Sequence, residues 1–290
     1  MTFSIVAYDP ERKEWGVAVQ SKFISVGSIV PWAISDVGAI ATQAWVNTSY
    51  GPKGLALLEQ GLTAEDTINL LTKNDDKRED RQIGIVDSYG NASSFTGSRC
   101  FDWAGHIVGE NYACQGNILV SEDTVLAMSQ AYRETKGDMV LKLLAVLEAG
   151  QEAGGDSRGK QSAAILIVKE KGAYDGGTDR YIDVRVDDHV HPIKELRRVF
   201  ELYNLSLLNR DEPDDKVMVE GEVLKVIKEV LKSDGFYEKD IDDKYDIYTK
   251  EVLKKWMHTN NFEVKERTDD YMWGSVYRFI EKRKEDISES

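Results

Sequence analysis

Four strand candidates precede the first helix candidate of this chain, and that order constrains the fold more than any other feature. Apolar, β-branched runs at about residues 2–8 and 15–21 flank the polar segment 9–14, which predicts a hairpin. Two further strand candidates follow near 28–34 and 39–44. A doubly wound fold would place a helix between successive strands from the start. The pattern therefore favours an antiparallel meander.

The rest of the first two thirds of the chain continues with helices, strands and a final helix. The candidates are helices at 55–59 and from 63, strands at 81–87 and 92–96, helices from 121 and at 139–149, strands at 161–168 and 180–186, and a helix at 192–203. This order favours a four-layer αββα sandwich, in which two antiparallel sheets pack face to face and helices cover the outer faces.

A charged, proline-containing segment divides the chain. Residues 209–215 read Asn-Arg-Asp-Glu-Pro-Asp-Asp, which is typical of a linker. We therefore expect a first domain at 1–208 and a second at 216–290. Three apolar stripes at helical spacing, around Ile227, Trp256 and Ile280, predict that the second domain is small and all-α.

The composition bounds the function. The chain has 290 residues, a formal net charge of -14 and 41% hydrophobic residues, which together indicate a globular protein that repels nucleic acid and anionic lipid surfaces. We found no run long enough to span a membrane and no secretion signal, so we expect a cytoplasmic protein. Cys100 and Cys114 are the only cysteines. We expect two free thiols, no cofactor and no metal.

Thr2 is the first candidate for chemistry. If Met1 is removed, the Thr2 hydroxyl and a free α-amine lie on one residue at the start of a strand. The amine has a pKa of roughly 7.7 to 8.0, so it can act as the base that activates the hydroxyl. Many proteins begin Met-Thr and simply bury their first strand, so residue 2 alone leaves both interpretations open.

A series of longer motifs resembles one family. Besides the segments 2–7 and 16–22, they are Gly38-Ala39-Ile40-Ala41-Thr42-Gln43-Ala44-Trp45, Ser49-Tyr50-Gly51-Pro52-Lys53-Gly54-Leu55, the run 99–106, Gln115-Gly116-Asn117, the Gly-rich run 151–164 and Val186-Asp187-Asp188-His189. Together they resemble an uncharacterised prokaryotic family placed in the N-terminal-nucleophile (Ntn) hydrolase superfamily. The segments 231–237 and 246–256 resemble a peptidoglycan-binding domain that members of this family often carry.

The resemblance implies an Ntn fold and amide hydrolysis by the N-terminal residue. Thr2 matches the nucleophile position. Gln20 falls where proteasome subunits carry an aspartate. Those enzymes also place a lysine in the third strand, where its charge lowers the pKa of the nucleophile, and the third strand of this chain has no lysine. Lys22 is the nearest cation that could replace it, and strand alternation puts Gln20 and Lys22 on one face. Lys22 could equally be a solvated lysine at a strand end.

Three further residues are candidates for supporting roles. Asp156 and Ser162 lie in and after a Gly-rich loop, somewhat as the proteasomal Asp and Ser that orient the amine do. The loop glycines could instead only shape a turn. Asn117 could donate an amide N–H to an oxyanion, or simply turn the chain.

Two rival sites compete with Thr2. Cys100 lies six positions before His106, and a thiol beside an imidazole is a familiar nucleophile, although buried inert cysteines are commoner. The run Asp187-Asp188-His189-Val190-His191 contains metal-ligand residue types. It also precedes Pro192 and a helix, whose first turn such residues cap, and we prefer that explanation.

The sequence thus leaves three function classes. We expect an Ntn-type amidohydrolase that acts on a small amide or peptide-like substrate, wall-derived fragments among the candidates, with Thr2 as nucleophile and base. The alternatives are a binding protein on an Ntn-like fold without turnover, and a protein that recognises cell-wall fragments through residues 216–290. We expect no nucleic-acid or membrane partner, and a homo-oligomer.

Overall fold

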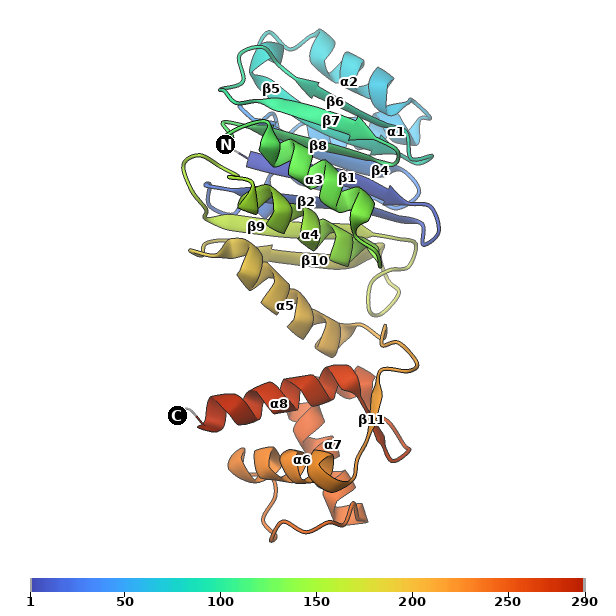
Figure 1. The fold of residues 1–290 in the computed structure, drawn as a ribbon. Helices are drawn as coiled ribbons and strands as arrows, with labels where there is room; N and C mark the ends of the chain where they lie inside the picture. The colour runs from blue at the N-terminus through green and yellow to red at the C-terminus, as the bar shows by residue number, and fades with distance from the viewer. Residues whose placement is uncertain (1, 289–290) are drawn as a thin grey trace. The chain divides into compact units, whose positions relative to one another are not determined.

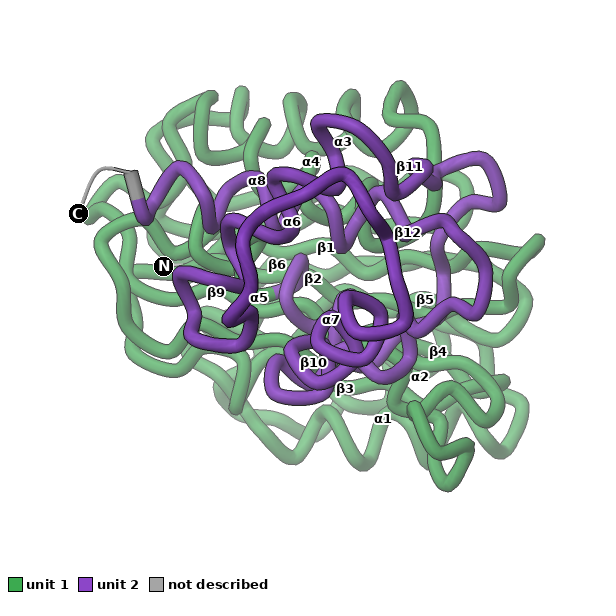
Figure 2. Tube along the Cα trace, turned by 90° about the horizontal axis from the view of Figure 1, so that it is seen from below, with its two compact units in different colours: residues 1–199 green, residues 200–290 purple. Residues whose placement is uncertain are grey.

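The computed structural model describes residues 2–288. Met1, whose removal the N-terminal chemistry requires, lies outside the described residues, as do residues 289–290. The chain divides into two compact units, residues 1–199 and 200–290, which are coloured separately in Figure 2. The division falls within one helix, α5 (Pro192–Leu207).

The larger sheet of the first unit has six strands in the order β10-β9-β2-β1-β8-β7, with every neighbouring pair antiparallel (Figure 1). Its strands are β1 (Thr2–Asp9), β2 (Glu14–Ser21), β7 (Gly105–Gly109), β8 (Tyr112–Asn117), β9 (Ser162–Val168) and β10 (Arg180–Val186). The predicted N-terminal hairpin is confirmed, because β1 pairs with β2 across the 9–14 turn. Thr2 is the first residue of β1, so it lies at one end of a central strand of this sheet.

The smaller sheet has four antiparallel strands in chain order. They are β3 (Pro31–Ile34), β4 (Gly38–Ala44), β5 (Arg81–Asp87) and β6 (Ala92–Thr96). Helices α1 (Tyr50–Glu59) and α2 (Ala64–Lys73) contact this sheet, whereas α3 (Asp123–Glu134) and α4 (Met139–Glu152) contact the larger one (Figure 1). The first unit is therefore a mixed α/β structure built on two antiparallel sheets.

Small apolar side chains fill the space between the two sheets. Val6, Val17 and Val19 of the larger sheet pack with Ala39 and Val86 of the smaller one, and all are fully buried. Side chains alternate along a strand, so the residues of β1 that share the face of Val6 are Ser4 and Thr2. Alternation therefore points the Thr2 side chain toward the smaller sheet.

The second unit contains α6 (Gly221–Ser233), α7 (Ile247–Thr259) and α8 (Gly274–Ser288) around a core that includes Ile227, Trp256 and Val276. The prediction that this region is all-α is wrong in one respect. A two-stranded ribbon pairs β11 (Lys216–Met218) with β12 (Tyr271–Trp273), and α8 begins only at Gly274. A short 3-10 turn, η3 (Glu263–Lys265), also lies in this unit, and two more, η1 (Val26–Ser28) and η2 (Arg78–Asp80), lie in the first unit.

The segment expected to be a linker is tied into the second unit. The fully buried Lys265 ammonium donates to the Leu208 carbonyl at 2.6 Å and pairs with Asp211. Arg278 pairs with Asp215 at 2.7 Å. A buried ammonium needs such oxygen partners, because desolvating an unpaired charge is costly. The domain boundaries at 208 and 216 stay a prediction.

Candidate functional site

Thr2 lines a pocket of about 600 Å³ in the first unit. The residue is 6% exposed, and its Oγ1 lies 3.1 Å from Ser21 Oγ on the neighbouring strand. On the other side Thr2 pairs in register with Asn117, which also lines the pocket. The first described residue, which carries a hydroxyl, is therefore at the wall of a cavity large enough for a small molecule.

Loops at the ends of strands supply the other walls. They follow β2, β4 and β8 and include Val26, Trp45 and Ile118. Three non-glycine residues in these loops or at the strand end before them have left-handed backbones: Ser25 (φ 53), Ala44 (φ 66) and Ile118 (φ 50). Such conformations cost on the order of 1–3 kcal/mol each, most for a β-branched residue, and cluster at functional sites.

Backbone hydrogen bonds hold these conformations in place. Ile118 N donates to the Phe101 carbonyl at 2.8 Å, and Trp45 N donates to the Asp80 carbonyl at 3.1 Å. Each bond joins two segments that both line the pocket. The walls are therefore preformed in the free protein.

A network of buried side-chain amides lies beside Thr2 between the sheets. Gln82 Oε1 accepts from Gln43 Nε2 at 2.7 Å and from Asn117 Nδ2 at 2.9 Å. Gln43 Nε2 also lies 3.3 Å from the Thr2 carbonyl, and Gln115 Nε2 donates to Ser4 Oγ at 2.7 Å. One N–H of Asn117 is thus committed to Gln82, which fixes the orientation of its amide beside Thr2.

Gln43, Gln82 and Ser21 are site residues that the sequence reasoning did not assign. The available signal was a glutamine within each of two strands that have an apolar middle, at Gln43 in β4 and Gln82 in β5. A buried amide needs hydrogen-bond partners, so two such residues predict a polar network within the sheet interior.

The expectation that Gln20 and Lys22 point toward Thr2 is not supported by the register. Gln20 pairs with Phe3, so it shares the opposite face of the sheet, and Ser21 occupies the position beside Thr2. Gln20 is fully buried, and neither polar atom of its amide has a hydrogen-bond partner among residues 2–288. The Lys22 side chain is exposed, beyond the end of β2, and does not line the pocket.

Asp156 and Ser162 hold one wall of the pocket rather than touching Thr2. Asp156 is buried and accepts from Lys22 N at 2.8 Å and Arg158 N at 2.9 Å. Ser162 Oγ donates to the Phe23 carbonyl at 2.5 Å and accepts from Val26 N at 3.1 Å. Both side chains therefore fix the loop at 22–26.

Cys100 and His106 do not form a nucleophilic pair. Cys100 lines the pocket, but its Sγ donates to the Arg81 carbonyl at 3.3 Å, and burial raises the pKa of the thiol to about 11. His106 Nδ1 lies 2.9 Å from Thr96 Oγ1, and burial lowers the pKa of its imidazole. A thiol with such a pKa is almost entirely protonated near neutral pH and is a weak nucleophile.

The residues weighed as metal ligands make protein contacts. His189 Nδ1 accepts from His191 N at 3.0 Å, and Asp188 accepts from Gln161 Nε2 at 3.0 Å. Across residues 2–288, no group of three or more His, Cys, Asp or Glu side chains is placed to hold a metal ion. Over the same range, every helix is too short or too polar to cross a lipid bilayer.

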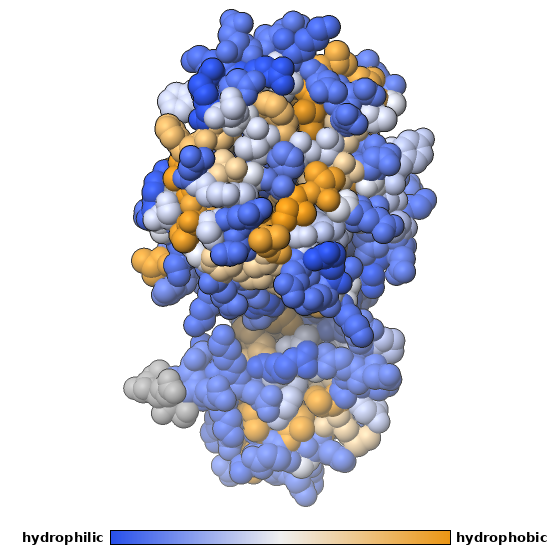
Figure 3. Space-filling view, turned by 45° about the horizontal axis from the view of Figure 1, so that its top comes forward, coloured by the Kyte–Doolittle hydropathy of each residue, from blue (hydrophilic) through white to orange (hydrophobic). Residues whose placement is uncertain are grey.

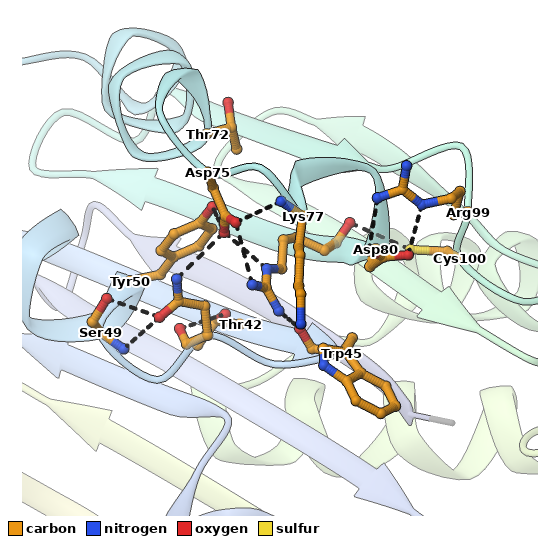
Figure 4. A network of polar contacts seen from close by, with 12 residues as sticks. Thr42, Trp45, Ser49, Tyr50, Thr72, Asp75, Lys77, Asp80, Arg99 and Cys100 are labelled. Atoms are coloured by element: carbon orange, nitrogen blue, oxygen red, sulfur yellow. Dashed lines mark hydrogen bonds and ion pairs between the residues drawn. The ribbon is translucent and has the colours of Figure 1, made fainter.

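A charged network lies behind the Trp45 loop (Figure 4). Asp75 accepts from Arg81 Nε at 2.9 Å and from the Tyr50 hydroxyl at 2.7 Å, and Arg81 Nη1 also donates to the Trp45 carbonyl. The Arg81 hydrogen bond, with help from Tyr50, holds the pKa of Asp75 well below its usual range. Burial first, and then the Asp75 hydrogen bond, raise the pKa of Tyr50.

Fold and pocket describe a mixed α/β protein in which two antiparallel sheets place a threonine, the first described residue, in a preformed pocket. A family model described as "Family of unknown function (DUF1028)" matches residues 2–196, and the chain belongs to this family. A second model, described as "Putative peptidoglycan binding domain", matches residues 206–280.

A solved structure gives the same assignment. A crystal structure of a protein of the same family from Silicibacter pomeroyi is 31% identical, covers 70% of this chain and 86% of its own, and superposes with a TM-score of 0.65. Anbu (ancestral beta-subunit) from Yersinia bercovieri is 11% identical over 69% of this chain and 93% of its own. Its TM-score is 0.30, and we infer nothing from this similarity. A search of curated proteins gave no match.

Proposed function

We propose that the protein is an Ntn-type amidohydrolase with an Ntn-like four-layer fold, acting on a small amide or peptide-like substrate. One observation carries the proposal: Thr2, the first residue of a central strand, lines a preformed pocket. Any other position in the chain would offer a hydroxyl without an adjacent α-amine.

In the proposed reaction, Thr2 Oγ1 attacks the substrate carbonyl carbon and its proton passes to the Thr2 α-amine. Ser21 Oγ, 3.1 Å from Thr2 Oγ1, can relay that proton. The second N–H of Asn117 is a candidate donor to the oxyanion. The intermediate then expels the amine, which takes the proton, and water hydrolyses the resulting Thr2 ester. Asp156 and Ser162 support the reaction by holding the pocket wall.

The reaction requires a free Thr2 amine, so the first test is intact-mass spectrometry of protein purified from its native cells. We expect a mass lower than that of the full sequence by one methionine residue, because the threonine that follows Met1 is small. Retention of Met1 in that protein would leave the amine acylated and unable to act as the base. The non-catalytic binding protein would then be the correct interpretation.

The second unit supports a second candidate function. Because the peptidoglycan-binding family model matches residues 206–280, we propose that this unit binds wall-derived glycan or peptide fragments. We expect the full chain to co-sediment with purified peptidoglycan and to bind soluble wall fragments in calorimetric titrations. Trp256 and Trp273 pack in or against the core of this unit, so they are poor candidates for sugar stacking. No binding in either assay would reduce the unit to a structural role.

A further inference from the structure

The Thr2 pocket carries an excess of positive charge. Its lining includes the cationic side chains of Lys77, Arg99 and Arg158 but only one carboxylate, that of Asp80. The chain as a whole has a formal net charge of -14, so composition would favour the opposite sign. The excess is therefore a local feature of this pocket.

The cations differ in how far protein carboxylates neutralise them. Arg99 contacts both oxygens of Asp80, at 2.9 and 2.8 Å. Arg158 lies 3.4 Å from Asp156. The Lys77 side chain is exposed and extends toward Trp45 (Figure 4), and among the described residues its ammonium makes no ion pair. Lys77 is thus the cation available to a ligand.

The rim of the same pocket is apolar and aromatic. Phe23, Trp45 and Phe101 line it and are 47%, 65% and 69% exposed, respectively. Apolar residues gather in patches on the face of the molecule shown in Figure 3. Large aromatic side chains around a cavity of this size are typical of a site that binds a small ligand with an apolar group.

Resting on the proposed function, we infer that the substrate is a small amide that carries both an apolar or aromatic group and a free carboxylate, such as an N-acyl amino acid or a dipeptide. The Lys77 ammonium binds the carboxylate, and the rim formed by Phe23, Trp45 and Phe101 covers the apolar group. The scissile carbonyl then lies at Thr2. Lys77 determines specificity and takes no part in the bond-breaking steps.

The test measures binding to a Thr2→Val variant, which binds without turnover. The probes are N-acetyl-phenylalanine and its N-methyl amide, which differ only in the C-terminal group, a carboxylate in the first and a neutral amide in the second. We expect the free acid to bind at least about tenfold more tightly, with a preference that weakens as salt is raised. Lys77→Gln in the same background should remove the preference. Lys53→Gln is the matched control, because Lys53 lines the neighbouring cleft with Tyr50 and Asp75 but not the Thr2 pocket.

The outcomes separate this inference from the proposed function. Equal affinity for acid and amide, no binding of either probe at millimolar concentration, or a preference that survives Lys77→Gln would overturn the inference. A Lys77-dependent preference for the acid, in a protein whose wild type hydrolyses no amide, would support the inference and contradict the hydrolase. Hydrolysis of neutral amides without preference for acids would support the hydrolase and contradict the inference.

Discussion

A Thr2→Val variant is expected to lose amide hydrolysis by at least roughly 10³-fold, because valine removes the nucleophilic oxygen and keeps the shape of the side chain. Valine is also small, so removal of Met1 should be unaffected. Valine loses the hydrogen bond between Thr2 Oγ1 and Ser21 Oγ, and the loss of one such neutral hydrogen bond costs about 1 kcal/mol of stability. The measurement is kcat/KM on a panel of small amides, with circular dichroism to verify folding.

Two variants control this result. Thr2→Ser keeps a hydroxyl beside the α-amine and should retain measurable hydrolysis. Cys100→Ala changes the other nucleophile type that lines the same pocket, and should retain activity within about twofold, because the Cys100 thiol is protonated near neutral pH. Loss of activity in Cys100→Ala together with activity in Thr2→Val would instead identify the thiol as the nucleophile.

The elements that could be predicted from the sequence are those with a clean hydrophobic period. The β1–β2 hairpin alternates apolar residues on either side of a polar turn, and the structure confirms it. Strands β7 and β8 were not predicted, because Gln115 and Asn117 place polar groups on the face toward the other sheet. Those amides donate hydrogen bonds to Ser4 and Gln82, which are distant in sequence, so no local pattern reveals the strand.

The same limit explains the site. Whether Gln20 or Ser21 faces Thr2 depends on the register of β1 against β2, and a shift of one residue exchanges the two faces. Alternation within one strand, the basis of the Gln20 and Lys22 prediction, cannot set that register. The pocket walls also depend on left-handed backbones at Ala44 and Ile118, which neither residue type indicates from the sequence.

Replacing Asp75 with asparagine is expected to destabilise the first unit by about 3 kcal/mol or more, because it leaves the Arg81 guanidinium without its carboxylate partner. The two side chains are only 13% and 10% exposed, so water cannot fully replace the lost partner. Arg81 also donates to the Trp45 carbonyl, so the Trp45 wall of the Thr2 pocket should loosen as well. Urea unfolding at pH 7 measures the change, and Asp76→Asn is the control, because Asp76 is exposed and should change stability by no more than about 0.5 kcal/mol.

The pH dependence of that difference tests its electrostatic origin. Since the folded protein holds the pKa of Asp75 below its usual range, the carboxylate stabilises the fold at pH values above its unfolded pKa of about 3.9. The stabilisation is lost as the pH falls from there through the lower folded pKa. The difference in unfolding free energy between wild type and Asp75→Asn should therefore stay constant from about pH 7 to 5 and shrink below about pH 4. A difference that persists unchanged in acid would contradict this origin. It would mean that Asp75 stabilises the fold through packing and neutral hydrogen bonds, and that its ion pair with Arg81 contributes nothing.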